Sequence, residues 1–368
     1  MPEKLKDLFF TASFVTQLGD AIQRVYPDFD QEKLSSLVFD AHWETRELKE
    51  RMRHVTNCLH ETLARGFPEA LEILIEIAPA FRGFDSMVFP DYVECYGMDH
   101  WDLSLPALAL FTPLCSSEYA IRPFLDQDGE RAMEYLYAWT EDDNHHVRRL
   151  ASEGCRPRLP WGMALPRFKK DPSPILPVLE KLKNDPSEYV RKSVANNLNA
   201  ISKDHPELVL DVCERWYGHT ANTDWIVKHA CRTMLRAGNR RAMLLFGFAD
   251  PTQINVNPLR LDRETLNIGE DLHFTFELSV DTDAACKVRL EYVIEYARPG
   301  EKTSRKVFQI REASLQPGSH TISRKHSFMD QSARKHYPGE HQIHLIVNGM
   351  EMARASLELT KATADSDH

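Results

Sequence analysis

The stretch DDNHHVRRLASEG (residues 142–154) indicates the fold of the first two thirds of the chain, because its pattern occurs twice more. Each copy is an acidic or asparagine-containing turn, then a valine and one or two basic residues that open a helix. The other copies are DPSEYVRKSVANN (185–197) and NTDWIVKHACRTM (222–234). A period of roughly 40 residues with paired helices is typical of a HEAT-type α-solenoid. We therefore expect the basic residues of the repeats to point into one continuous groove.

The hydrophobic pattern of the sequence changes near residue 250. Before it, apolar residues recur every three or four positions, as in EALEILIEIAPAF (69–81), which predicts helices. After residue 256, apolar and polar residues alternate in short segments such as LHFTFELSV (272–280), which predicts strands. The fold class expected is therefore multidomain α + β. A HEAT-like α-solenoid over 1–250 precedes a small immunoglobulin-like β-sandwich without a disulfide over 256–361 and a disordered polar tail over 362–368.

The composition of the chain argues against several classes of protein. No apolar run approaches the roughly 18 residues of a transmembrane helix, and the first residues lack the apolar core of a signal peptide. The seven cysteines are scattered and form no C-x-x-C pair, and none of the 16 histidines falls in an H-E-x-x-H frame. We expect a cytoplasmic protein with reduced thiols, no membrane association, no metal and no cofactor.

Positive charge is concentrated in two places, although the formal net charge of the chain is -10. Residues 145–170 contain seven Lys or Arg and one acid, and residues 301–336 contain eight Lys or Arg and three acids. Local patches of this kind attract polyanions even when the whole protein is acidic.

One helix face in the first patch carries residues suited to chemistry. Arg149, Glu153 and Arg156 lie at i, i+4 and i+7 and share that face, although Gly154 and Pro157 loosen or end the helix. One interpretation is a simple ion pair between Arg149 and Glu153, worth about 0.3 kcal/mol. The other is phosphate binding, because a single glutamate cannot neutralise so many guanidinium groups. The further basic residues expected in the groove are Arg148, Arg158, Arg191 and Lys192.

Two more residues have a structural and a functional interpretation. Trp161, in RLPWG (158–162), is either a packed loop aromatic or a base-facing or ribose-facing ring. Glu118 follows Ser116 and Ser117, either of which could cap a helix. That order predicts a first-turn glutamate that complements the helix dipole.

The segments HWDLSLPALALFTPLCSSEYAIRPFL (100–125), HHVRRLASEGCRPRLPWG (145–162) and YVRKSVANNLNAISKDHP (189–206) resemble the AlkC branch of the HEAT-repeat DNA glycosylases that repair alkylated DNA. This resemblance runs from near residue 50 to about 250. The strand-rich part, with SRKHSF (323–328), is similar to the immunoglobulin-like domain that some members append. The resemblance thus covers most of the chain.

The resemblance implies a monofunctional DNA glycosylase that releases 3-methyladenine and 3-methylcytosine from double-stranded DNA without flipping the lesion. Glu153 would be the catalytic carboxylate and Glu118 a supporting acid, while Arg149, Arg156 and Trp161 would contact the lesion or the backbone. In the sister AlkD branch the catalytic aspartate follows a W-D pair, but here that position is near Leu105, which has no carboxylate. This departure also favours Glu153 as the catalytic carboxylate. The family further implies a monomer in the bacterial cytoplasm or nucleoid.

The second basic patch leaves two interpretations open. Its expected DNA-binding residues are Arg324, Lys325, Arg334 and Lys335. The strand-rich domain could close over the duplex as a clamp, or these could be solvated loop charges. For the whole chain, the alternative to a glycosylase is a non-catalytic HEAT-repeat scaffold that binds DNA or a protein partner, because fold alone does not establish activity.

Overall fold

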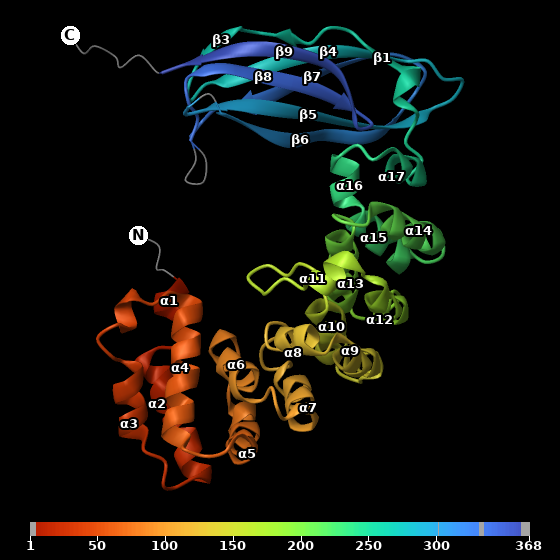
Figure 1. Cartoon of the computed structure of the whole chain (residues 1–368). Helices are drawn as coiled ribbons and strands as arrows, with labels where there is room; N and C mark the ends of the chain where they lie inside the picture. Colours follow the sequence, from red (N-terminus) through yellow and green to blue (C-terminus); the bar gives the residue numbers. More distant parts are fainter. Residues whose placement is uncertain (1–4, 301, 331–334, 362–368) are drawn as a thin grey trace, which may run out of the picture. The chain divides into compact units, whose positions relative to one another are not determined.

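The computed structural model describes residues 5–300, 302–330 and 335–361, and it divides the chain into two compact units (Figure 1). Unit 1 comprises Met1–Ala230 and unit 2 comprises Cys231–His368. Unit 1 is helical and unit 2 is mainly β-sheet, so the expected α-solenoid followed by a β-sandwich is confirmed.

Unit 1 is built from successive packed helices. They are α1 (Leu5–Leu8), α2 (Ala12–Val25), α3 (Gln31–Val38), α4 (Leu48–Leu63), α5 (Phe67–Ile77), α6 (Val88–Tyr96), α7 (Trp101–Phe111), α8 (Ile121–Gln127), α9 (Gly129–Ala138), α10 (His145–Gly154), α11 (Pro166–Lys170), α12 (Leu176–Leu182), α13 (Glu188–Ile201), α14 (Pro206–Trp216) and α15 (Ala221–Ala230). Figure 1 shows that they follow one another along the unit in chain order.

The three sequence repeats open α10, α13 and α15, and α13 packs against both of the other two helices. Val147, Val190 and Val227 are all buried, so the valine of each repeat anchors its helix in the core. Helices α9, α12 and α14 each pack against the repeat helix that follows, which gives the paired arrangement that the period predicts.

Unit 2 contains two sheets. A short helical segment, α16 (Arg232–Arg236) and α17 (Arg240–Leu245), comes first. The strands are β1 (Ile254–Val256), β2 (Arg260–Leu261), β3 (Thr265–Asn267), β4 (Asp271–Val280), β5 (Cys286–Arg298), β6 (Lys302–Leu315), β7 (Gly318–Ser327), β8 (Gly339–Val347) and β9 (Met350–Thr360). One sheet has the order β3-β9-β8-β5-β6, and in the other β4 pairs with β1, β2 and β7.

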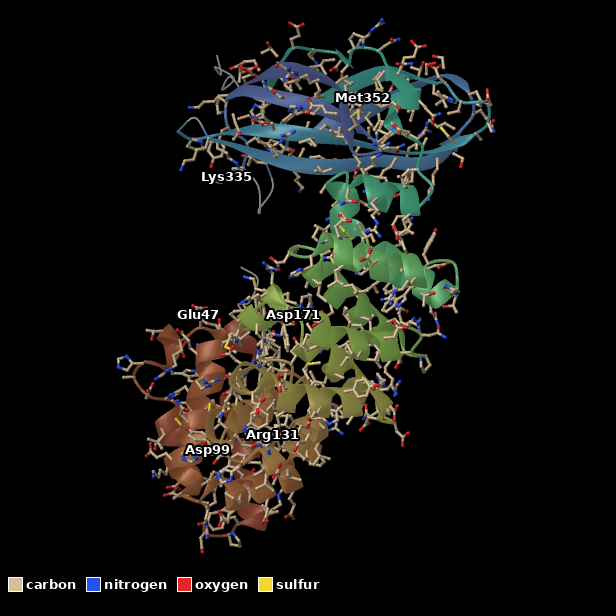
Figure 2. All side chains as sticks on the ribbon, turned by 45° about the vertical axis from the view of Figure 1, so that its right-hand side comes forward. Glu47, Asp99, Arg131, Asp171, Lys335 and Met352 are labelled. Atoms are coloured by element: carbon tan, nitrogen blue, oxygen red, sulfur yellow. The ribbon has the colours of Figure 1, made fainter. Side chains whose placement is uncertain are left out.

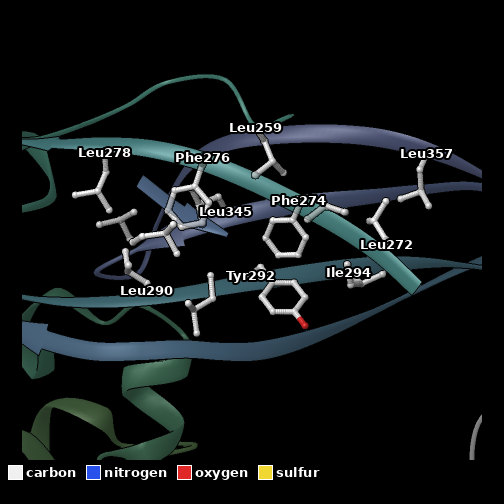
Figure 3. Packing of buried hydrophobic residues seen from close by; sticks show 14 of the residues in the cluster. Leu259, Leu272, Phe274, Phe276, Leu278, Leu290, Tyr292, Ile294, Leu345 and Leu357 are labelled. Atoms are coloured by element: carbon white, nitrogen blue, oxygen red, sulfur yellow. The ribbon is translucent and has the colours of Figure 1, made fainter. Parts of the chain in front are cut away.

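The core of the sandwich follows from the alternation in β4. Every second residue of this strand is buried, so Phe274 and Phe276 face the other sheet. There they pack with Tyr292 and Ile294 of β5 and with Leu345 of β8 (Figure 3). The side chains between them point outward, as period-two patterning requires.

The division between the two units falls after residue 230, about twenty residues before the end of the helical domain expected from the sequence. Helices α16 and α17 belong to unit 2 because their segment packs closely on the sandwich. A Cβ on Gly349 would lie 2.2 Å from the Cα of Gly238, so the β8–β9 turn touches the α16–α17 connection backbone to backbone. Asn348 adds a hydrogen bond of 2.8 Å from its Nδ2 to the carbonyl oxygen of Ala249. The tail at 362–368 lies outside the described residues.

Candidate active site

Helix α10 positions the central residues of the site. The side chain of Asn144 caps the helix by accepting a hydrogen bond of 2.9 Å from the amide of His146. The helix ends at Gly154, where a Cβ would lie 2.7 Å from Cγ2 of Ile121, so α10 and α8 pack too closely for a side chain. Because Arg149 and Glu153 are one turn apart, they share a face with Arg156 just beyond the helix end.

Both oxygens of the buried Glu153 carboxylate are engaged. Oε1 contacts a guanidinium nitrogen of Arg156 and lies 3.5 Å from Nη2 of Arg149. Oε2 accepts a hydrogen bond of 2.6 Å from the hydroxyl of Ser193 on α13. Ser152 donates a further bond of 2.7 Å to the Ser193 hydroxyl. The carboxylate is therefore fixed by charge-assisted contacts from two helices and one loop.

Arg149 joins the two glutamates that the sequence proposed for chemistry. Its Nη1 contacts the carboxylate of Glu118 and donates 2.7 Å to the hydroxyl of Ser116, and its guanidinium lies 5.0 Å from the ring centre of Tyr189. Burial lowers the pKa of Arg149, but the charges of Glu153 and Glu118 outweigh it, so the pKa is raised overall. Arg149 is thus a permanent cation between two carboxylates.

The expectation that Glu118 lies in the first turn of a serine-capped helix is wrong. Glu118 lies in a turn before α8, and the residue that precedes this helix, Ala120, makes no side-chain cap. The serines have other partners: Ser116 donates 3.0 Å to the Glu118 carboxylate, and Ser117 donates 2.8 Å to the carbonyl of Leu108. These bonds orient Glu118 toward Arg149 instead of toward a helix terminus.

Three of the arginines expected in the groove have partners within the protein. Arg148 forms a two-pronged pair with the buried Asp185, with Nε–Oδ2 and Nη2–Oδ1 distances of 2.6 and 3.0 Å. Arg158 pairs with Asp204. Nη1 of Arg191 donates 2.7 Å to the backbone carbonyl of Asp185. The neutralising acids come from the neighbouring repeat, which the sequence around residue 150 cannot reveal.

The remaining basic residues lie on surfaces. Lys192 is exposed on α13. In unit 2, Arg324 and Lys325 are exposed on β7, where Lys325 lies 2.8 Å from Asp271. Lys335 is also exposed (Figure 2), and Arg334 lies outside the described residues.

Trp161 lies in the 155–165 loop that joins α10 to α11, and its side chain is 66% exposed. Its φ is +62°, a left-handed conformation that costs a non-glycine residue about 1–2 kcal/mol. Lys49 of α4 donates a hydrogen bond of 2.9 Å to the Trp161 carbonyl. The protein thus holds a large ring in solvent on a strained backbone, which is typical of a functional position.

The same loop is supported from inside by Arg122, which the sequence gave no reason to select. This arginine is completely buried. Its guanidinium donates to the carbonyls of Gly154 at 2.8 Å and Arg156 at 3.0 Å, and also to that of Met163. Burial lowers the pKa of Arg122 to about 10. A cation at this place also satisfies carbonyls at the end of α10.

Two hollows adjoin these residues. An open recess of about 390 Å³ lies along α4 and the residues just before it. Its lining consists of Arg46, Lys49, Glu50, Met52, Arg53, His54 and Asn57. A second cavity of about 10 Å³, roughly the size of one water molecule, includes Glu94, Ser116 and Tyr119 in its lining. Burial raises the pKa of Glu94 and that of Tyr119 above their usual values.

The position that corresponds to the AlkD-type aspartate cannot carry charge. Leu105 is fully buried in α7, and Asp102 of the W-D pair is exposed and pairs with Arg131 at 2.8 Å. Within residues 5–300, 302–330 and 335–361, no three His, Cys, Asp or Glu side chains gather closely enough to hold a metal ion. No helix in those same ranges has the length and apolar composition that a membrane crossing needs.

Comparison with known proteins adds two family matches. Residues 115–234 match the family described as DNA alkylation repair enzyme, a range that contains Glu118, Arg149, Glu153, Arg156 and Trp161. Residues 255–361 match the family described as uncharacterised protein YhaZ, C-terminal Ig-like domain. The two ranges fall on the helical and the β-sheet parts of the chain.

Two individual proteins are similar over nearly the whole chain. The uncharacterized protein YhaZ of Bacillus subtilis (strain 168) is 46% identical over 346 residues, which is 94% of this chain and 96% of that protein. The structure of the Pseudomonas fluorescens alkylpurine DNA glycosylase AlkC bound to DNA containing an abasic site analog is 38% identical with a TM-score of 0.90. That match covers 97% of this chain and 100% of the solved one.

Proposed function

The chain belongs to the AlkC-type family of DNA alkylation repair enzymes with a C-terminal immunoglobulin-like domain, and we propose that it is a monofunctional DNA glycosylase. Its substrates are cationic alkylated bases, 3-methyladenine and 3-methylcytosine, in double-stranded DNA. The reaction is hydrolysis of the N-glycosidic bond, and the lesion is reached without being flipped from the stack.

The fixed carboxylate of Glu153 is the observation that carries this proposal. An N3-alkylated base already bears a positive charge and departs neutral, so the reaction needs no general acid. What remains is a sugar that becomes cationic as the bond breaks and a water molecule that attacks it. A carboxylate about 4 Å from that sugar contributes ~4 kcal/mol at an effective dielectric of 20, or roughly a thousandfold in rate. A preorganised anion needs no reorganisation when the charge develops.

The arginines around Glu153 fit a site that is completed by DNA. Glu118 and Glu153 together balance Arg149 and Arg156, so the four side chains are neutral as a set. Phosphates of a bound duplex compete for the two guanidinium groups, because arginine binds phosphate in the same two-pronged way as carboxylate. The local charge then becomes negative on the side that faces the sugar. Glu118 supports Glu153 through Arg149, which contacts both carboxylates.

We also propose that unit 2 binds the DNA backbone. Arg324, Lys325 and Lys335 are exposed on the sandwich, and exposed lysines and arginines commonly contact phosphates. Such contacts raise affinity for any duplex and make binding sensitive to salt. Unit 2 would then close over DNA that unit 1 has bound.

The decisive experiment is release of 3-methyladenine from methylated duplex DNA under single-turnover conditions, with the wild type beside Glu153→Gln. Glutamine keeps the oxygen that accepts from Ser193 but loses the charge. We expect release by the wild type, loss of release in the variant and similar duplex affinity in both. Duplex binding without any release by the wild type would instead identify a non-catalytic scaffold.

A further inference from the structure

We propose that Lys49 is a positioning residue that locks the Trp161 loop to the Glu118 turn, so that the exposed indole and the two carboxylates keep a fixed spacing before DNA arrives. This inference rests on the proposed glycosylase function. Lys49 lies in α4, far from the repeats in which the motif residues occur.

The ammonium of Lys49 reaches two segments at once. Its Nζ is 2.9 Å from the carbonyl oxygen of Trp161, 112 positions later in the chain. The same Nζ lies 4.6 Å from the ring centre of Tyr119, within the range of a cation–π contact. Tyr119 directly follows Glu118, so one side chain bridges the turn that carries the acid and the loop that carries the tryptophan.

The contacts of Lys49 are connected to the two glutamates of the site. Glu118 contacts Arg149, and Arg149 lies 3.5 Å from Glu153. A continuous series of contacts therefore runs from Trp161 through Lys49, Tyr119, Glu118 and Arg149 to Glu153. The links are a hydrogen bond, a cation–π contact, the peptide bond between the neighbours Tyr119 and Glu118, and two ionic contacts, of which the last lies within α10.

The loop needs an outer restraint because of its geometry. Arg122 holds the beginning and the later part of the 155–165 loop through the carbonyls of Gly154, Arg156 and Met163. The tip is different: Trp161 is exposed and has a φ of +62°, so apolar burial does not fix it. The hydrogen bond that Lys49 donates to the Trp161 carbonyl opposes relaxation of this strained backbone.

A lysine at position 49 has the required chemistry. Its long stem spans the distance from α4, and its charged head can donate to a carbonyl while it faces an aromatic ring. Arginine has the same two abilities, with a planar head and more donors. Methionine matches the length and apolar stem of lysine but has neither the charge nor the donor.

The test compares Lys49→Met and Lys49→Arg with the wild type. Lys33→Met is the matched control, because Lys33 is an exposed unit 1 lysine whose ion pair with Glu61, at 3.4 Å, is of the weak surface kind. The first readout is the fluorine spectrum of full-length protein labelled with 5-fluorotryptophan, in which Trp161→Phe assigns the Trp161 resonance. The second is the single-turnover release rate at saturating methylated duplex, together with the dissociation constant for DNA.

We expect Lys49→Met to shift or broaden the Trp161 resonance and to lower the release rate about tenfold, with a dissociation constant close to that of Lys33→Met. Lys49→Arg should restore both the resonance and most of the rate. An unchanged resonance and rate in Lys49→Met would overturn the proposal. The proposal would also be overturned if Lys49→Met only weakened DNA binding, because that result would identify Lys49 as a phosphate contact. If the wild type releases no base, the proposed function fails, while the fluorine spectra without DNA still decide whether the tether exists.

Discussion

Each unit of the molecule contains a largely buried arginine held by two glutamates, and the two sets differ in what surrounds them. In unit 1, Arg149 joins Glu118 and Glu153. In the sandwich, Arg289 joins Glu291 and Glu312, with both nitrogen–oxygen distances at 2.6 Å. Burial of charge alone therefore does not identify an active site, since buried ion pairs also serve structural roles.

The difference lies in how each set is assembled. Arg289 and Glu312 are direct partners across β5 and β6, and Glu291 is two residues along the same strand, so a single strand pairing creates the whole set. The unit 1 set joins a turn and a helix, takes a serine from α13 and includes a second arginine, Arg156. The four charges of the unit 1 set cancel in the free protein. A polyanion that binds its two arginines would therefore change the net charge around the carboxylates. In the sandwich set, Arg289 contacts two carboxylates, and negative charge around an arginine does not attract a polyanion.

The largest expected effect separates the two sets by function. Glu153→Gln should lower base release about a thousandfold, the value of a lost anion near a cationic sugar. Glu291→Gln should leave release within twofold and lower the free energy of unfolding by about 1–3 kcal/mol, because it weakens a hydrogen bond to a charged group. Single-turnover assays and urea unfolding of both variants measure the contrast. A strong loss of release in Glu291→Gln would contradict it.

The second effect concerns the outer glutamate of each set. Glu118→Gln removes an anion that we expect to lie about twice as far from the sugar as Glu153, where the energy falls to ~2 kcal/mol, or about thirtyfold in rate. Glu312→Gln, its counterpart in the sandwich, should not alter release. Release rates measured at saturating DNA separate an effect on the reaction from an effect on DNA affinity. Equal release rates for Glu118→Gln and the wild type would mean that Glu118 does not contribute to catalysis.

A third, smaller effect tests unit 2 as a DNA-binding surface. The double variant Arg324→Gln/Lys325→Gln should weaken binding of undamaged duplex and reduce the slope of log K against log salt by about 1.8, if each residue neutralises one phosphate. Release at saturating DNA should be unchanged, because neither residue belongs to the set around Glu153. The charge-matched control is Lys181→Gln/Lys183→Gln, two residues of unit 1 that pair with surface acids. An equal loss in the control would reveal a nonspecific charge effect.

The sequence predicted the periodic features of this molecule and missed those made by distant contacts. The 40-residue repeat and the alternation in β4 predicted both folds, because burial imposes these periods locally. The i, i+4, i+7 spacing likewise predicted the cluster of Arg149, Glu153 and Arg156. Helical periodicity does not reveal which unit α16 and α17 pack against, so the sequence alone does not place the division at residue 230.

The residues that hold the site were missed for a related reason. Ser193 is 40 positions from Glu153, and Lys49 is 112 positions from Trp161. Arg122 looks like an ordinary helix residue until its three carbonyl partners are visible. Likewise, Asp185 pairs with Arg148 although the two are 37 positions apart. A single sequence carries no signal for such pairs.

The smallest expected effect is a pH dependence confined to the sandwich. His341 is fully buried, and burial lowers its pKa below the usual value of about 6.5. The unfolded chain therefore binds more protons than the folded one as the pH falls below that value. The stability that depends on neutral His341 is complete above about pH 6.5 and is lost as the pH falls through the lowered pKa.

The variant His341→Asn isolates this contribution. The asparagine amide can still donate to the carbonyl of Gly339, which His341 contacts at 2.8 Å, but it does not titrate. We expect the wild type to lose about 1 kcal/mol more stability than the variant between pH 7 and pH 5 in urea unfolding of the sandwich transition. Base release at pH 7 should be the same in both. Parallel pH dependences would mean that other groups, such as the His336–Asp330 pair, dominate acid sensitivity.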